Sequence, residues 1–343
     1  MSKTIFVVDD NDSNLLVAEA ALEEHHRIFT MSSAARMFVM LEKIKPDLIL
    51  LDVKMPGMDG IEALRRLKKN PLYEDIAVMF LTGVSDTSEE AAKGFELGAI
   101  DFVTKPYSPT VLLNRIRTHL DIDNLIRERS AQLWRMKTGI ISVMAELVES
   151  RDSVTGGHIE RTTVFVKLMI DALLERGIYL EDLQEWDHDM VISSSRLHDV
   201  GKITVSDLIL NKPGRLSLAE FDNIKMHTVE GERIINQMAA ETKEEAFFRN
   251  ALIFAGTHHE RWDGTGYPRG TKGEETPLQG RIMAIADVYD ALVSRRPYKE
   301  PFPAEQAEAI IMADSGVHFD PVLVEVFFQI RDKFKSVPIG FSN

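Results

Sequence analysis

Candidate metal ligands gather in the second half of this 343-residue chain. Two adjacent histidines, His258-His259, open a segment that runs into a glycine-rich turn at 264–268, and an adjacent His198-Asp199 pair lies sixty residues earlier. Imidazole nitrogens and carboxylate oxygens in such pairs can hold more than one divalent metal beside a phosphodiester. Further candidate ligands are His158, His227 and Asp287.

The donor types indicate which metal this cluster would bind. The chain has no cysteine, so the available ligands are nitrogen and oxygen, and this set favours iron, manganese or a similar metal over structural zinc. Neighbouring residues on a helix point about 100° apart, so we expect each adjacent pair to serve two metals, with a carboxylate bridging them. Two metals roughly 3.5–4 Å apart could activate water and clamp the phosphate.

Lys202 follows the His198-Asp199 pair by one helical turn. Its ammonium could donate a hydrogen bond or a proton to the phosphate or to the leaving oxygen. We therefore group Lys202 with His198 and Asp199 as candidate catalytic residues. A lone histidine is more often a cap, a surface residue or a hydrogen-bonded core residue. That interpretation applies to His25, His26, His119 and His188.

Residues that could accept a phosphoryl group form a second set, within residues 1–120. The set comprises Asp9, Asp10, Asp52, Thr82 and Lys105, each at the end of a short apolar run. Its three carboxylates suit an octahedral Mg²⁺ that keeps several waters. Asp52 could then attack a phosphoryl group, while Lys105 neutralises charge and the Thr82 hydroxyl contacts the new phosphate. One such aspartate is usually a turn residue, so the signal lies in the combination.

The elements that must position this second set are five strands. Nearly continuous apolar runs separated by amphipathic stretches predict a parallel, doubly wound sheet, whose carboxyl edge would carry all five residues. The runs are Ile5–Val8, Arg27–Met31, Asp47–Leu51, Ile76–Leu81 and Asp101–Thr104. After Pro109 the pattern becomes helical and stays so. The predicted fold class is therefore α/β followed by all-α.

We expect an α/β domain over residues 1–120, a linker helix over 121–147 and an all-helical domain over 148–343. Within the linker, apolar residues recur every seven positions, as in a coiled-coil seam. They are Ile126, Leu133, Ile140 and Leu147, with Met136 and Val143 between them. Pairing with a second chain and packing of one amphipathic helix on its own domain both stay open, because Arg129 interrupts this short seam.

Composition excludes several classes of protein. Lys and Arg total 40 against 54 Asp and Glu, giving a net charge of −14 that repels nucleic-acid polymers. No apolar run reaches the roughly 20 residues of a membrane span, and the amino terminus lacks the apolar region of a signal peptide. We expect a cytoplasmic protein without a membrane partner, for which the absence of cysteine is neutral to mildly favourable.

The first 120 residues resemble the response-regulator receiver domain. The resemblance rests on Val8-Asp9-Asp10, the run Leu51–Gly60, Thr82 and Lys105-Pro106, and it spans about residues 3–120. It implies that Asp52 is phosphorylated by a partner histidine kinase. Phe102 falls where that family has its switching aromatic, although an ordinary core phenylalanine is an equal interpretation.

Residues 140–335 resemble the HD-GYP phosphodiesterases, a branch of the HD superfamily. The matching residues are Arg151–His158, Leu197–Ile203, Lys212-Pro213-Gly214, His227, His258–Pro268 and Ala286–Asp290. The resemblance implies an all-helical domain that hydrolyses cyclic di-GMP, with metal ligands at His158, His198, Asp199, His227, His258, His259 and Asp287. It also implies substrate contacts at Tyr267, Arg296 and Lys299.

Some members of that family add a glutamate four residues before the first ligand histidine, supporting a third metal. This chain has Val154 there, so we expect two metals and leave three open. The predicted function is hydrolysis of cyclic di-GMP to pGpG, with further cleavage to GMP left open. Alternatives are hydrolysis of 3′,3′-cyclic GMP-AMP and a non-catalytic dinucleotide sensor or interaction module.

Overall fold

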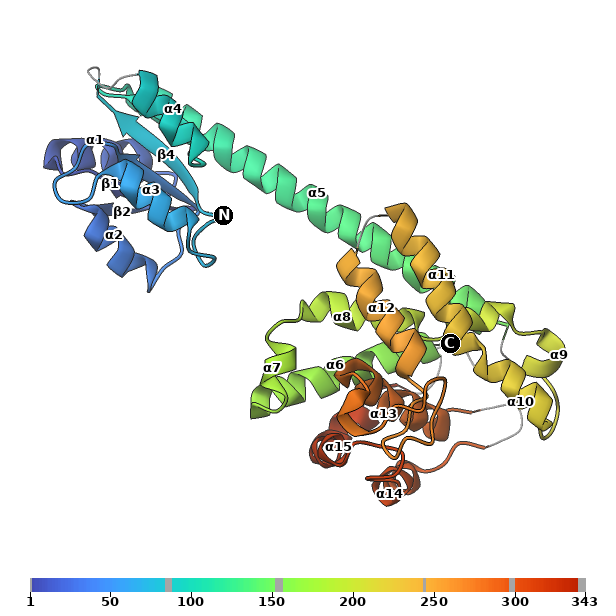
Figure 1. Ribbon diagram of the computed structural model, residues 1–343. Coiled ribbons are helices and arrows are strands. Elements are labelled where there is room, and N and C mark those ends of the chain that lie inside the picture. Colours follow the sequence, from blue (N-terminus) through green and yellow to red (C-terminus); the bar gives the residue numbers. More distant parts are fainter. Residues whose placement is uncertain (1, 84–87, 152–156, 243–244, 296–299, 339–343) are drawn as a thin grey trace. The chain divides into compact units, whose positions relative to one another are not determined.

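The computed structural model describes residues 2–83, 88–151, 157–242, 245–295 and 300–338. The chain forms two compact units, residues 1–133 and 134–343 (Figure 1). Helix α5 (Pro109–Glu149) runs unbroken through the boundary between them. Both predicted junctions, at 120/121 and 147/148, therefore fall inside one helix.

The first unit is built on a five-stranded parallel sheet in the order β2-β1-β3-β4-β5. Its strands are β1 (Thr4–Val8), β2 (Arg27–Met31), β3 (Leu48–Asp52), β4 (Ala77–Thr82) and β5 (Asp101–Thr104). The predicted doubly wound sheet is confirmed: β1 begins one residue earlier than predicted, and β3 and β4 are shifted by one residue toward the carboxyl terminus. Because Val8 pairs with Leu51, the residues that follow them, Asp9 and Asp52, emerge side by side at the carboxyl edge.

Helices cover both faces of this sheet. They are α1 (Asp12–Leu22), α2 (Ala34–Leu41), α3 (Gly60–Lys68), α4 (Ser88–Glu96) and the first turns of α5. One apolar core joins the sheet to α2 and α3, through side chains such as Met37 and Leu64. The other joins it to α1 and α5, through Leu15, Leu112 and Ile116. Burial on both faces explains why the strands are apolar at nearly every position.

The second unit is helical, as predicted. Its elements are α6 (His158–Arg176), α7 (Leu180–Leu183), α8 (His188–Ser194), the 3₁₀ turns η1 (Ser195–Leu197) and η2 (Val200–Thr204), α9 (Asp207–Leu210), α10 (Leu218–Lys225), α11 (His227–Thr242), α12 (Glu245–Thr257), η3 (Gly273–Glu275), α13 (Leu278–Val293), α14 (Ala304–Ala313) and α15 (Pro321–Lys335). Helix α6 lies against α13 and α15 (Figure 1). Phe165 stacks on Phe334 at 4.6 Å and meets Tyr289 edge-on, so aromatic packing fixes these three helices.

Helix α5 carries two different apolar faces. Ile141 is buried, with Trp134 packed beside it, in a core shared with η1, η2, α11 and α12. The predicted seam lies elsewhere on the helix and is exposed: Ile126 by 59%, Leu133 by 61%, Ile140 by 54% and Leu147 by 63%. The seam is therefore not the face that packs on the second unit. Across the described ranges, no helix is long and apolar enough to cross a membrane.

Candidate functional site

The predicted phosphoacceptor residues meet at the carboxyl edge of the sheet. Asp9 and Asp52 are buried, and the Lys105 ammonium lies 2.6 Å from Asp9 Oδ2 and 2.7 Å from Asp52 Oδ2. Carboxylate oxygens of Asp9, Asp10 and Asp52 lie within 4.8 Å of one another, close enough to share one cation. Burial raises the pKa of Asp52, whereas Lys105 opposes that rise. Thr82 ends the neighbouring strand β4, with its side chain nearly buried.

Asn14 on α1 and Phe102 on β5 are two further side chains of the first unit. Asn14, which sequence analysis did not single out, donates from Nδ2 to both oxygens of Asp9, at 3.0 and 3.1 Å. No local pattern marks an asparagine on α1 for that contact. Phe102 is half-buried and meets Phe95 edge-on at 5.8 Å, on the core that α2 and α3 share. This position fits either interpretation of Phe102.

In the second unit, the predicted ligands form two groups that share Asp199. One group comprises Asp199, His227, His258 and His259, and the other comprises His158, His198 and Asp199, with ligand atoms within 4.8 Å in each group. Asp199 Oδ1 lies 3.3 Å from His227 Nε2, while Oδ2 lies 3.4 Å from His198 Nε2. Each oxygen of this carboxylate thus faces a different group, as a bridging ligand would.

The orientation of the rings shows whether a metal fits. Backbone carbonyls lie 2.9 Å from His198 Nδ1, 2.6 Å from His227 Nδ1 and 2.9 Å from His258 Nδ1. We therefore place each proton on Nδ1, which leaves a lone pair on each Nε2. The Nε2 atoms of His227 and His258 face each other at 3.2 Å. His198 Nε2 and Asp199 Oδ1 are buried without a hydrogen-bond partner. Converging buried lone pairs are unfavourable unless a cation binds them, so the residues fit a metal.

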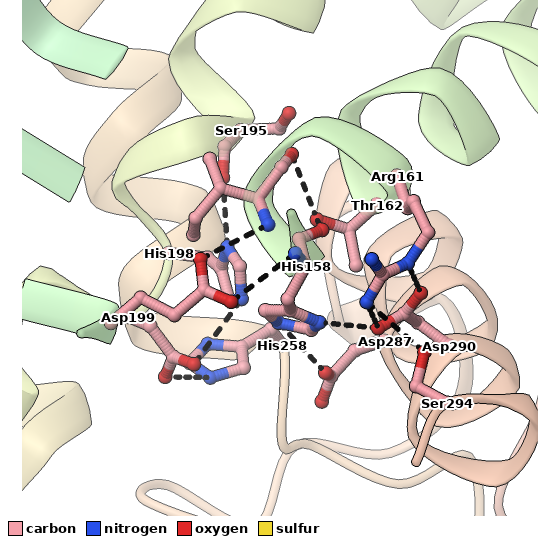
Figure 2. A network of polar contacts seen from close by, with 12 residues as sticks. His158, Arg161, Thr162, Ser195, His198, Asp199, His258, Asp287, Asp290 and Ser294 are labelled. Atoms are coloured by element: carbon pink, nitrogen blue, oxygen red, sulfur yellow. Dashed lines mark hydrogen bonds and ion pairs between the residues drawn. The ribbon is translucent and has the colours of Figure 1, made fainter. Parts of the chain in front are cut away.

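His158 is oriented by carboxylates rather than by a carbonyl. Its Nδ1 lies 2.8 Å from Asp290 Oδ2, and its Nε2 lies 3.5 Å from Asp287 Oδ1 (Figure 2). Arg161 clasps the same Asp290 through Nε at 2.5 Å and Nη2 at 3.0 Å. Burial lowers the pKa of His158, but Asp290 and Asp287 outweigh it, so the pKa lies above its ordinary value. Asp287 contacts His158 here but joins neither ligand group.

Charge and burial favour the metal-binding protonation states of three further ligands, His227, His259 and Asp199. Burial lowers the pKa of His227 to about 4, and burial together with His258 holds the pKa of His259 well below its ordinary value. Burial raises the pKa of Asp199, but Lys202 and His198 outweigh it and hold that pKa well below its ordinary value. Neutral imidazoles and an ionised carboxylate are the forms that coordinate metals.

The local structure corrects one step of the sequence argument. His198 and Asp199 lie between the 3₁₀ turns η1 and η2, and His258-His259 follow the end of α12, so no adjacent pair lies within an α-helix. The 100° argument therefore does not apply, and both His258 and His259 belong to one group. Gly201 makes the arrangement possible, because a Cβ there would lie 1.9 Å from the carbonyl oxygen of His227. This close approach brings Asp199 beside the start of α11.

Five of the seven predicted ligands line a cavity of about 280 Å³, namely His158, Asp199, His227, His259 and Asp287. Lys202 and Tyr267 line it, and the Lys202 ammonium lies 2.7 Å from Asp199 Oδ2. Arg196, which sequence analysis missed, also lines the cavity and brings a second cation to it. The only sequence signal for this role was that Arg196 lies two residues before the candidate ligand His198. The predicted substrate contacts Arg296 and Lys299 lie outside the described residues, as does Val154.

The loop after His259 is held by a residue that had no predicted role. The buried Glu260 carboxylate accepts backbone N–H groups from Arg269 at 2.7 Å and Thr271 at 3.1 Å. Gly266 allows the loop to fold back, because a Cβ there would lie 2.3 Å from the nitrogen of Arg261. Tyr267 then lies over the His259 ring at 4.8 Å. The loop thus positions Tyr267 at the cavity.

Comparison with known proteins identifies both units. A family model described as the response regulator receiver domain matches residues 5–117, and one described as the HD domain matches residues 142–323. A Vibrio cholerae protein named "Probable cyclic di-GMP phosphodiesterase" is 38% identical, over 99% of this chain and 80% of that protein. "Cyclic di-GMP phosphodiesterase response regulator RpfG" of Xanthomonas campestris is 32% identical, over 99% of this chain and 90% of that protein.

The chain belongs to the HD-domain phosphodiesterase response regulators. This response regulator also matches "3'3'-cGAMP-specific phosphodiesterase 2" of Vibrio cholerae, at 39% identity over 57% of this chain and 35% of that protein. The predicted receiver domain, HD domain and phosphodiesterase class are confirmed. Membership also implies a phosphodonor such as a histidine kinase and a divalent metal in the HD domain.

Replacing Asp290 by asparagine should weaken both metal binding and folding. The change leaves the buried Arg161 without its counter-ion, which costs roughly 3 kcal/mol, and removes the carboxylate that orients His158. We expect unfolding at a lower temperature and metal affinity reduced roughly 10- to 100-fold, measured by calorimetry and by metal content after dialysis. Asp332, whose side chain is 84% exposed on α15, supplies the control variant Asp332→Asn. Unaltered metal affinity in Asp290→Asn would contradict the orienting role.

Proposed function

We propose that this response regulator hydrolyses cyclic di-GMP to linear pGpG in a metal-dependent reaction. The observation that carries the proposal is the pair of ligand groups sharing Asp199 in one cavity with Lys202. The cyclic di-GMP phosphodiesterases from Vibrio cholerae and Xanthomonas campestris, which align along almost the whole chain, support this substrate.

The metal would be held by His227, His258 and His259 on one side and by His158 and His198 on the other, with Asp199 between them. Asp287, beside His158, is the remaining ligand candidate. Divalent metals bound there would supply Lewis-acid polarisation of the phosphodiester and activation of water. Nitrogen and oxygen donors favour iron or manganese, and the shared carboxylate favours two ions.

The chain's own side chains would bind the phosphates and transfer the proton. Lys202 and Arg196 place positive charge in the cavity, which offsets the net charge of −14 for an anionic dinucleotide. Lys202, held beside Asp199, is suited to donate a proton to the leaving oxygen. Burial raises the pKa of Tyr267, so its phenol stays protonated and can donate a hydrogen bond to substrate. Arg296 and Lys299 are proposed as further phosphate contacts.

A second candidate substrate is 3′,3′-cyclic GMP-AMP. The relative named for that activity matches 194 residues at 39% identity, which supports this substrate as the second candidate. A purely non-catalytic sensor is less well supported, because a sensor needs neither the converging lone pairs nor an ammonium beside the shared carboxylate.

Regulation would begin at Asp52. Its carboxylate lies with Asp9 and Asp10 in a group able to hold Mg²⁺, and Lys105 would neutralise the incoming phosphoryl group. A partner histidine kinase would supply that group, with Thr82 and Phe102 as proposed sensors of it. Helix α5 is continuous from the first unit into the second, so it is the element through which we expect the signal to pass.

A homodimer is proposed through α5. The exposed seam keeps its seven-residue spacing from Ile126 to Leu147, and a different face of the helix packs in the second unit's core. A second copy of the same helix has the matching spacing to cover it. This arrangement favours pairing over the alternative in which the seam packs on its own domain.

The deciding experiment is anaerobic incubation with Mn²⁺ or Fe²⁺ and each cyclic dinucleotide, followed by chromatography of the products. We expect pGpG from cyclic di-GMP, and loss of both bound metal and hydrolysis in His198→Ala and Asp199→Ala, because each variant removes a ligand. His188→Ala is the matched control, since that ring bonds the Leu183 carbonyl instead. Unchanged metal content and turnover in both ligand variants would refute the assignment, and faster cleavage of cyclic GMP-AMP would favour the second candidate.

Phosphorylation is tested with acetyl phosphate and Mg²⁺. Asp52→Asn should abolish labelling, because an amide is not a competent nucleophile, and labelling of the parent protein should change its turnover. Asp59→Asn is the control, since this exposed residue caps α3 and an asparagine keeps the cap. Persistent labelling of Asp52→Asn, read by intact mass, would move the acceptor to another residue.

The dimer is tested by light scattering during gel filtration. Leu133→Glu combined with Ile140→Glu should convert a dimer into a monomer, because like charges would meet across the seam. Arg135→Glu, an exposed change off the seam, should leave the dimer intact. A parent protein that elutes as a monomer, with or without phosphorylation, would exclude pairing through α5.

A further inference from the structure

The last turns of α5 form part of the wall of the catalytic cavity. Ala145, Val148 and Glu149 line the same space as His158 and Asp199. Glu149 is the final residue of α5 and is only 9% exposed. Burying a carboxylate is unfavourable unless its oxygens find hydrogen-bond donors. The donors that Glu149 finds indicate its role.

Glu149 caps the helix that begins with His158. One carboxylate oxygen accepts the backbone N–H of His158 at 3.2 Å, and the other accepts that of Ile159 at 3.4 Å. The first amides of a helix lack partners within the helix, and a carboxylate there also interacts favourably with the helix dipole. The residue that would normally supply a cap, Gly157, has no side chain and makes no such bond. Glu149, which lies on a different helix, therefore accepts the hydrogen bonds that an N-cap side chain would normally accept.

The capped backbone carries a proposed metal ligand. The His158 ring is held by Asp290 from α13, while its backbone nitrogen is held by Glu149 from α5. The His158 side of the metal site thus depends on two supports from different helices. On the other side, the Nδ1 groups of His227 and His258 bond carbonyls three or four residues earlier in the chain. Among the described residues, only the His158 side of the metal site is held by backbone hydrogen bonds to a side chain of α5.

We propose that Glu149 is a positioning residue, whose carboxylate fixes the first turn of α6 and so sets the place of His158 in the metal site. The inference rests on the proposed function, because it takes His158 as a ligand. It follows that a shift or rotation at the end of α5 alters the His158 side of the site first. The link between the regulatory helix and the chemistry is then a pair of hydrogen bonds.

The test compares the full-length, metal-loaded protein with Glu149→Ala and Glu149→Gln. Amide hydrogen exchange is measured on peptides that span the start of α6, together with Mn²⁺ affinity, kcat and KM. Glu160→Gln is the matched control, since it removes an exposed acidic charge from the same first turn without removing these hydrogen bonds. Both Glu149 variants and the control keep the fold if their unfolding temperatures stay near that of the parent.

In Glu149→Ala we expect faster exchange at the start of α6 and roughly tenfold weaker binding of one of two Mn²⁺ ions, as for loss of an outer support of a ligand. We expect kcat to fall by about the same factor, with KM changed by less than about threefold, because the proposed substrate contacts are made by Lys202, Arg196 and Tyr267 rather than by Glu149. Glu149→Gln, which keeps one acceptor oxygen, should fall between the parent and Glu149→Ala. Glu160→Gln should match the parent in every measurement.

Three results would overturn the inference. Exchange, affinity and kcat in Glu149→Ala equal to the parent would overturn it while leaving the proposed function intact. Loss of a metal ion without faster exchange at α6 would show that Glu149 is a ligand rather than a support. A parent protein that neither binds Mn²⁺ nor hydrolyses a cyclic dinucleotide would overturn the proposed function, and this inference with it.

Discussion

The organisation of the second unit follows from one unfavourable arrangement, a carboxylate whose buried oxygen, Asp199 Oδ1, lies among imidazole lone pairs. Asp199 is surrounded by Nε2 atoms whose partner nitrogens are all committed to backbone carbonyls. Without a cation such a cluster would repel itself, so the helical scaffold must hold it together until one binds. The aromatic contacts among Phe165, Tyr289 and Phe334 fix α6, α13 and α15 and provide that rigidity.

The ligands come from elements that are far apart in sequence. Close backbone contacts and buried hydrogen bonds bring these elements together. Gly201 allows η2 to touch the first turn of α11, which brings Asp199 to His227. Asp290 ties α13 to His158, and Glu260 folds the loop that carries Tyr267. The supports of the site are thus buried carboxylates that accept hydrogen bonds from helix starts, rings and loop amides. They organise the site without any need to contact substrate.

Sequence predicted the sheet and the gathering of Asp9, Asp52 and Lys105 well, because strand periodicity and the geometry of parallel sheets together determine which residues share an edge. Sequence also singled out the histidines that converge on Asp199, because residue type limits what can bind a metal. It failed where tertiary placement decides the role. The partner of Glu149 is the start of a helix nine residues later, and that of Asp290 is a ring 132 residues away, which no local pattern reveals. The helical geometry assumed for the adjacent pairs was wrong, because 3₁₀ turns and a helix end lie there.

The packed face and the exposed seam of α5 constrain the length of this helix. One face packs in the second unit's core or lines its cavity, through Trp134, Ile141 and Val148. The other face is the exposed seam, with Leu133, Ile140 and Leu147. Both faces repeat every seven residues, and they are offset from each other by one residue. Inserting or deleting a single residue upstream of this stretch would rotate everything before it by about 100° relative to the cavity wall. A change of seven residues would restore the phase to within about 20°. We therefore expect functional relatives with longer or shorter forms of this helix to differ by numbers of residues that keep this phase, of which seven is the smallest.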